Sequence, residues 1–154
     1  MSSDLWSFSL SLYARPGVEQ ACLQLQSTGV NVCLLLCAAW LGQRGVGCNE
    51  QRLQQLRSVV KPWDADVVQP LRALRTQWKS VATSDEDLRA LREKVKALEL
   101  EAERHLIVRL EQSTQGWQQD EASDLTPWLE GVAADAAHLD RDALHQLRVA
   151  VTGT

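Results

Sequence analysis

Asp135, His138, Asp142 and His145 are the residues whose types and spacing come closest to those of a chemical site. Their 3-4-3 spacing puts all four on one face of a helix. An acidic residue three positions before or after a histidine is how helical bundles hold iron or manganese, so a metal-dependent enzyme is one interpretation. Such bundles take ligands from several facing helices, whereas no second helix here carries a matching set. The competing interpretation is a solvated face beside an apolar stripe, and we expect no metal and no catalytic residue.

Four cysteines all lie in the first third of the chain: Cys22, Cys33, Cys37 and Cys48. Three of them have aliphatic neighbours, which is typical of reduced, buried thiols in a reducing compartment. Cys33 and Cys37 share a helix face, and two metal ligands are the alternative. The chain also lacks a glycine-rich phosphate loop and a nucleophile elbow. The sequence therefore predicts no cofactor and a protein that is not an enzyme.

Charge is distributed unevenly along the chain. Residues 44–82 carry seven basic and three acidic residues, although the whole chain has a net charge of −4. Three of the basic residues share one helical face: Arg72, Arg75 and Lys79. They could face the phosphates of an RNA-containing assembly. The alternative is internal pairing with the acidic tail or with the acids of the next helix, namely Glu93, Glu99 and Glu103. The acidic balance of the chain favours this pairing over nucleic-acid binding.

Apolar residues recur at helical spacing throughout, so the fold class expected is all-α with a single domain over residues 1–154. A compact N-terminal helical core should occupy residues 1–47, a long antiparallel helical hairpin residues 48–113, and a C-terminal helical region that packs on them residues 124–152. Asp4 and Asn31 are expected helix caps. The segment after Asn31 is apolar all round, which predicts the central buried helix.

Apolar heptads define the two arms of the hairpin. The first arm has seven-residue spacing at Leu53, Val60, Val67, Leu74 and Val81, with Pro62 and Pro70 expected to break or kink it. Of the two, we expect Pro62 to start a new helical segment. The second arm should begin after a cap at residues 84–85 and bury Leu88, Leu91, Val95 and Leu98, then Leu106 and Leu110 after a register shift. The C-terminal region is either one helix or two that are divided near Asp140.

Three apolar residues of the second arm fall off this stripe: Leu100, Ile107 and Val108. If they cluster, something other than water should cover them. A protein partner, a second copy of the chain, or the C-terminal helix folding back are the alternatives.

The N-terminal segment resembles an uncharacterised family of proteobacterial proteins of about this length. The residues that carry the resemblance are LWSFSLSLY from Leu5, PGV from Pro16, CLQLQ from Cys22 and the LLLCAAWL run from Leu34. It implies a cytoplasmic bacterial protein of unknown function and no particular site residue, cofactor or partner.

The longest apolar run, from Val30 to Leu41, is too short for a membrane span, and no targeting segment is recognisable, so we expect a cytoplasmic protein without membrane attachment. The expected role is that of a non-enzymatic protein–protein interaction or adaptor protein, with an unknown protein partner or a homo-oligomer. A regulatory factor bound to an RNA-containing assembly through residues 44–82 is the alternative, and the metal-dependent helical-bundle enzyme is a third.

Overall fold

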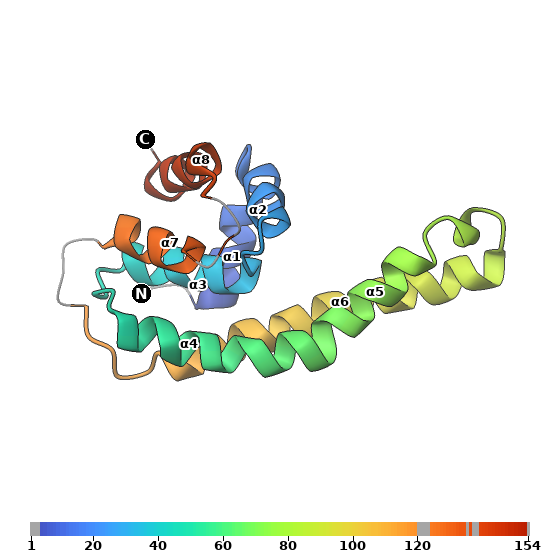
Figure 1. Cartoon of the computed structure of the whole chain (residues 1–154), viewed down its shortest axis with the longest axis horizontal. Coiled ribbons are helices and arrows are strands. Elements are labelled where there is room, and N and C mark those ends of the chain that lie inside the picture. The colour runs from blue at the N-terminus through green and yellow to red at the C-terminus, as the bar shows by residue number, and fades with distance from the viewer. Residues whose placement is uncertain (1–3, 120–123, 135, 137–138, 154) are drawn as a thin grey trace.

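The computed structural model describes residues 4–119, 124–134, 136 and 139–153, and this part of the chain is all-α. A long hairpin extends away from a body of shorter helices (Figure 1). The helices of the body are α1 (Leu5–Tyr13), α2 (Val18–Ser27), α3 (Val32–Gln43), α7 (Leu125–Ala133) and α8 (Arg141–Thr152). The hairpin consists of α4 (Glu50–Trp63), the π-helix η1 (Asp64–Val68), α5 (Gln69–Gln77), the 3₁₀ turn η2 (Val81–Thr83) and α6 (Glu86–Ser113).

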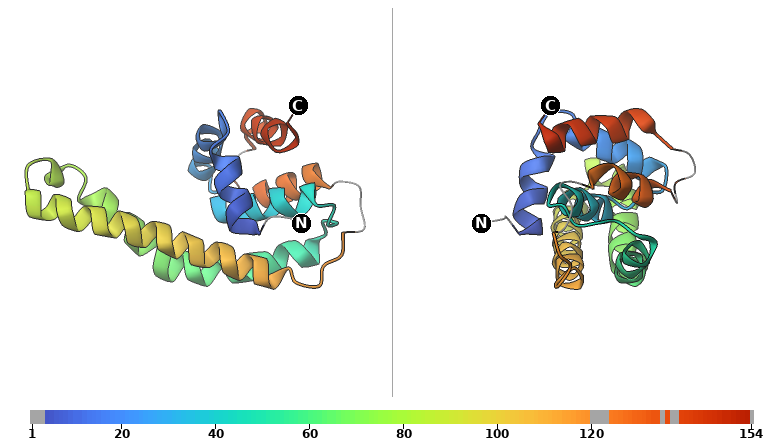
Figure 2. Two further views of the ribbon diagram at one scale, coloured as in Figure 1. Left: turned by 180° about the vertical axis from the view of Figure 1, so that it is seen from behind. Right: turned by 90° about the vertical axis from the view of Figure 1, so that its left-hand side faces the viewer.

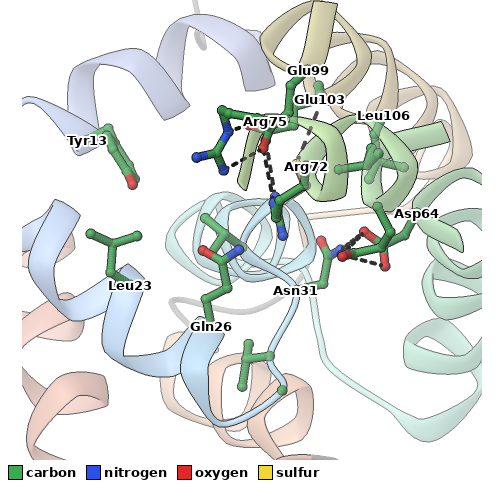
Figure 3. Close-up of a pocket in the computed structure, with 16 residues that line it drawn as sticks. Tyr13, Leu23, Gln26, Asn31, Asp64, Arg72, Arg75, Glu99, Glu103 and Leu106 are labelled. Carbon is green, nitrogen blue, oxygen red and sulfur yellow. Dashed lines mark hydrogen bonds and ion pairs between the residues drawn. The ribbon is translucent and has the colours of Figure 1, made fainter. Parts of the chain in front are cut away.

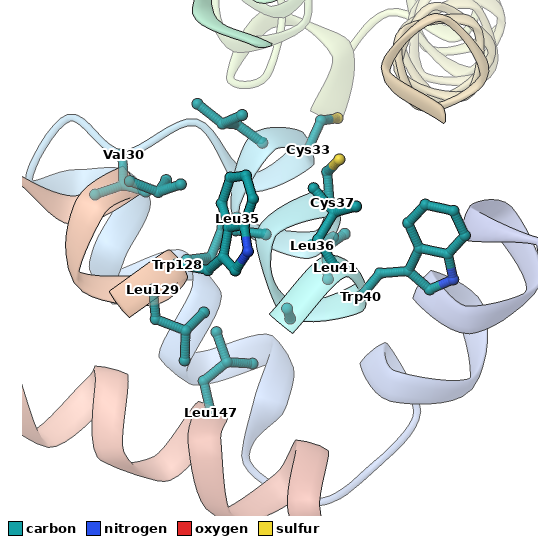
Figure 4. Packing of buried hydrophobic residues seen from close by; sticks show 14 of the residues in the cluster. Val30, Cys33, Leu35, Leu36, Cys37, Trp40, Leu41, Trp128, Leu129 and Leu147 are labelled. Atoms are coloured by element: carbon teal, nitrogen blue, oxygen red, sulfur yellow. The ribbon is translucent and has the colours of Figure 1, made fainter. Parts of the chain in front are cut away.

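Helix α3 is the centre of the body, as its composition predicts. Every residue from Cys33 to Gly42 is buried, and helices α1, α2, α4, α6, α7 and α8 all contact it. Asn31 caps it, because its Oδ1 accepts a hydrogen bond from the Leu34 N–H at 3.0 Å. Asp4 caps α1 in the same way. Figure 4 shows the leucines of α3 between Trp40 on one side and Trp128 on the other.

Helix α7 closes the body by packing directly on α3. The contact depends on Gly42, where an added Cβ would lie 2.5 Å from the Cα of Leu125. The fully buried Trp128 satisfies its indole N–H by donating to the carbonyl of Val46 at 2.7 Å. The segment after residue 123 is therefore an integral part of the core.

The C-terminal region is two helices. Asp140 separates them and caps α8, since its side chain accepts a hydrogen bond from the Ala143 N–H at 3.0 Å. Helix α8 packs against α2, α3 and α7. The expected packing of the C-terminal region on the N-terminal core is confirmed. None of the helices in the described part of the chain has both the length and the apolar character that a membrane span requires.

The first arm of the hairpin runs on through Pro62, so the expectation that Pro62 begins a new helical segment was wrong. Pro62 lies inside α4, and the π-helix η1 begins two residues later. A proline removes a backbone donor, and a change of hydrogen-bond spacing is one way in which a helix accommodates it. Pro70 lies in the first turn of α5, where its missing N–H costs least.

The second arm differs from its predicted stripe. Leu91 and Leu98 are 49% and 52% exposed, while Val95, Glu99 and Ala102 are buried. The register of Leu106 and Leu110, at the base next to the body, continues outward by steps of three and four residues, so the predicted register shift does not occur. In the first arm, Leu53 and Val60 are buried, whereas Leu74 and Val81 are exposed.

Removing side-chain volume from α3 should be costly. We expect Leu35→Ala to lower the free energy of unfolding by about 2–5 kcal/mol, because Leu35 is fully buried and its neighbours are held by several helices. Chemical denaturation measures this change, with Leu10→Ala on the exposed side of α1 as the control. A loss below about 0.5 kcal/mol for Leu35→Ala would contradict the central place of α3.

The cysteine thiols should react in the order of their burial. Burial raises the pKa of Cys22 to about 12 and that of Cys48 to about 11, and it raises the pKa of Cys33 and Cys37 further. All four are free, and only Cys48 is partly exposed. We expect a thiol reagent to label Cys48 first in the native protein and the other three only after denaturation. Rapid native labelling of Cys37 would exclude the packing described for α3.

Candidate functional site

A polar cleft of about 440 Å³ lies where the hairpin meets the body. Tyr13 and Leu23 line it from the body, and Arg72 and Arg75 of α5 line it from the hairpin, together with Glu99 of α6 (Figure 3). Its size is that of a small-molecule site. It is also the place where charged residues of the two arms meet, so its chemistry depends on how these charges are paired.

Glu99 is the centre of that pairing. Its carboxylate accepts hydrogen bonds from the Nε of Arg75 at 2.5 Å and from the Nε of Arg72 at 3.0 Å. A terminal nitrogen of Arg72 also donates to Glu103 at 3.3 Å. The Glu99 side chain is 8% exposed, while the two arginines are 27% and 30% exposed. The buried acid is thus bound by two guanidinium groups that reach it from the cleft side.

The two carboxyl groups respond to this environment in opposite directions. Burial by itself raises the pKa of Glu99, but the hydrogen bonds from Arg75 and Arg72 outweigh it and hold the pKa below its ordinary value. Burial is also the largest influence on Glu103, where Arg72 and Arg75 do not offset it, so the pKa of Glu103 is raised. Burial, followed by nearby acidic groups, raises the pKa of Tyr13 to about 12. The cleft therefore holds one firmly ionised acid and a second that protonates more easily.

A second polar link joins α3 to the hairpin. The Asn31 amide that caps α3 also donates to Asp64 at 3.4 Å, and Gln69 donates to the same carboxylate at 3.1 Å. Asp64 and Gln69 are five residues apart, which is the hydrogen-bond spacing of a π-helix, and Asp64 begins η1. The π-helix therefore places a carboxylate against the cap of the buried helix.

The arginines and the cysteine of the cleft have partners within the chain. The donors of Arg72 and Arg75 are directed at carboxylates of the same chain. Cys33 lines the cleft as a thiol whose Sγ lies 3.9 Å from the Glu103 carbonyl, and its raised pKa disfavours the nucleophilic thiolate.

The predicted basic strip is divided in the structure. Arg72 and Arg75 are internally paired with Glu99 and Glu103, as the alternative interpretation held. Glu93 instead lies 3.4 Å from Lys96 of its own helix. Lys79 lies exposed beyond the end of α5. The three residues therefore do not present one continuous positive surface.

The predicted apolar face of α6 is also divided. Leu100 and Val108 are 57% and 43% exposed, but Ile107 is 2% exposed and belongs to the core, so its assignment to an exposed face was wrong. The physical reason is that the body packs on the flank of α6 that carries Ile107. A shallow pocket beside Leu100 and Val108 is lined by Trp6 of α1, over which the guanidinium of Arg104 lies at 5.1 Å.

The metal candidates are only partly within the described residues. Asp135 and His138 lie outside them, while Asp142 and His145 are exposed on α8. His145 is hydrogen-bonded through Nδ1 to Arg148 at 2.8 Å. In residues 4–119, 124–134, 136 and 139–153, no three His, Cys, Asp or Glu side chains are grouped so that they could hold a metal ion.

Sequence reasoning missed several residues of these sites. Asp64 contacts Asn31, the cap of α3, and Gln69 contacts Asp64 across the π-helix, for which the sequence carries no clear signal. The exposure of Leu91 and Leu98 could have been found by extending the Leu106 register backward.

Replacing the central acid should destabilise the hairpin. We expect Glu99→Gln to lower the free energy of unfolding by about 1–3 kcal/mol, because a neutral amide cannot bind two guanidinium groups as a carboxylate does. Thermal or chemical denaturation tests this, with Glu93→Gln as a control on the exposed side of the same helix. An equal effect of both changes would contradict the role given to Glu99.

The parent protein and the Glu99→Gln variant should differ in how their stability depends on pH in the acidic range. Because the native pKa of Glu99 lies below the ordinary 4.5, the unfolded chain takes up this proton first, and stability is lost as the pH falls toward the native pKa. The raised pKa of Glu103 has the opposite effect on stability. The contribution of Glu103 to stability is lost as the pH rises through its native pKa. We expect Glu99→Gln to lose less stability than the parent protein between pH 5 and about pH 3.

Comparison with known proteins gives a family and no activity. No curated protein and no solved structure matches the chain. A family model described as "Protein of unknown function (DUF2390)" matches residues 4–110, which extend from α1 nearly to the end of α6. The resemblance seen in the first forty-five residues is thereby confirmed, and it includes both arms of the hairpin. The chain belongs to this family of proteins of unknown function, DUF2390.

Proposed function

We propose that this chain is a cytoplasmic, non-enzymatic interaction protein that binds a protein partner through the outer part of its hairpin. The observation that carries the proposal is the exposure of leucines on a hairpin that projects from the body (Figure 1). An apolar surface that the chain leaves uncovered is typical of a protein-binding site.

Exposed large apolar side chains gather on the hairpin. In the described part of the chain, those on the hairpin are Leu74, Val81, Leu91, Leu98, Leu100 and Val108, and those on the body are Leu10, Leu23, Leu139 and Val149. The hairpin thus carries more exposed large apolar residues than the body does.

Four leucines form one face of the hairpin, which we call the leucine face: Leu71, Leu74, Leu91 and Leu98. Each directly precedes a charged residue that binds the opposite arm, namely Arg72, Arg75, Arg92 and Glu99. A step of one residue turns the side-chain direction by about 100° around a helix. In two antiparallel helices whose charged residues face each other, the step back to the preceding residue therefore leads to the same flank of the pair in both helices. The charged residues lie toward the cleft, so the leucines lie on the flank away from it.

The internal pairing of Arg72 and Arg75 weakens the alternative of RNA binding. Phosphate contacts would have to compete with a buried carboxylate at 2.5–3.0 Å. Burial of the leucine face in an interface would contribute more to binding than contacts of these paired arginines, because burying a leucine side chain contributes about 1.5–3 kcal/mol.

The proposal predicts that partner binding is lost when the leucine face becomes acidic. We expect the double substitution Leu91→Glu and Leu98→Glu to abolish retention of a protein that the parent chain captures in its native cell, since docking would then bury two charges. Affinity capture followed by mass spectrometry measures this, with circular dichroism to establish that the variant folds.

The matched control is Leu10→Glu with Val149→Glu, two exposed apolar residues of the body. It should retain the same protein. If both variants retain every protein that the parent chain does, the leucine face is not a docking surface and the proposal fails.

A further inference from the structure

Two residues of opposite charge lie beside Leu98 on α6. Lys94 lies four residues before Leu98 and Glu101 three residues after it, on the same flank of α6, and both are exposed. A second copy of α6 laid across Leu98 in the opposite direction presents a glutamate to this lysine and a lysine to this glutamate. In a parallel arrangement, lysine would face lysine and glutamate would face glutamate, which is repulsive.

We propose that two copies of this chain dock antiparallel through their leucine faces, about a two-fold axis at Leu98; this inference rests on the proposed function of that face. A two-fold interface uses the same surface on both copies, so its contacts must be self-complementary. Here Leu98 meets its own copy, and Lys94 meets Glu101, which also lies 3.9 Å from His105 of its own helix. Leu91 meets His105 beside Trp63, whose ring centre lies 6.2 Å from that of His105. The contact from Leu91 to His105 is about 21 Å long at the rise of an α-helix.

The body leaves room for this arrangement. Ile107, which is buried against the body, follows Leu98 by nine residues, and nine residues bring a helix half a turn around. The body and Leu98 therefore lie on opposite sides of α6. Seen along the hairpin, the body stands on one side of the two arms (Figure 2). In the dimer the two bodies point away from each other.

The two hairpins then form a four-helix bundle. Each contributes Leu71 and Leu74 from α5 and Leu91 and Leu98 from α6, and the arms already pack antiparallel as such bundles require. The leucines that are partly exposed in a single copy become the shared core, and the Arg72–Glu99–Arg75 cluster stays on the outside of the bundle.

Light scattering on the purified chain, combined with charge exchange, tests the inference. The parent chain should have twice the mass of the 17.2 kDa monomer. Lys94→Glu and Glu101→Lys, each alone, should raise the dissociation constant about tenfold, because each change places like charges together twice in a symmetric dimer. The double variant with both changes should recover the parent value, since the exchange restores opposite charges.

Lys96→Glu is the control, because it makes the same change of charge on the other flank of α6, and it should leave the dissociation constant unchanged. A parent chain that stays monomeric at about 0.5 mM overturns the inference, as does a dimer that the double exchange does not restore. If the chain is monomeric while Leu91→Glu with Leu98→Glu still loses a captured protein, the proposed function holds with another partner. If neither result is obtained, both fail.

Discussion

Helix α3 carries apolar side chains around its whole circumference, and a helix of this kind must be enclosed on every side. Six other helices supply that enclosure, from both ends of the sequence. At about 1.5–3 kcal/mol for each fully buried leucine, this burial is the dominant stabilising contribution in the body. The close contact at Gly42 and the hydrogen bond from Trp128 to Val46 follow from it, since both bring α7 onto the same helix.

The need to enclose α3 also divides the hairpin into a base that packs on the body and an outer part that does not. Its base contributes Leu53, Leu56, Leu106 and Leu110 to the core around α3, whereas its outer part has no body beside it. There the two arms are joined partly by charge, through Glu99 and the two arginines, and partly by Val95 and Ala102. Charged residues occupy contact positions that leucines could have filled, and the leucines lie on the flank away from the body. The outer hairpin is thus held together by polar contacts as well as apolar ones, while several of its leucines stay exposed.

Much of the fold could be predicted from the sequence because it depends on local patterns. Asp4, Asn31 and Asp140 cap helices as their residue types indicate, and the apolar run after Asn31 identifies the buried helix. The exposure of Leu91 and Leu98 follows only if the stripe of Leu106 and Leu110, and not the stripe of Leu88 and Leu91, is the buried one. Two stripes at helical period were available on α6, and packing against the body, through Leu106 and Ile107, selected between them.

The candidate sites were harder to predict than the fold. Pairing of Arg72 and Arg75 with Glu99 was one of two readings of the charges, and only the relative rotation of the arms decides it. The contact of Asp64 with Asn31 depends on the π-helix η1, which changes the rotation of everything after it. The change to π-helical spacing follows from tertiary packing, and the residue types of the DADVV segment do not indicate it.

The place of α7 and α8 on α3 has a consequence for synthesis of the chain. Helix α3 ends at residue 43, but Trp128, Leu129 and Leu147, which cover it, are made about a hundred residues later. At ordinary rates of translation this interval is on the order of ten seconds. During that time the most apolar helix of the protein is outside the ribosome without the C-terminal helices that cover it. The nascent chain therefore needs protection from aggregation for longer, whereas the finished protein does not need it.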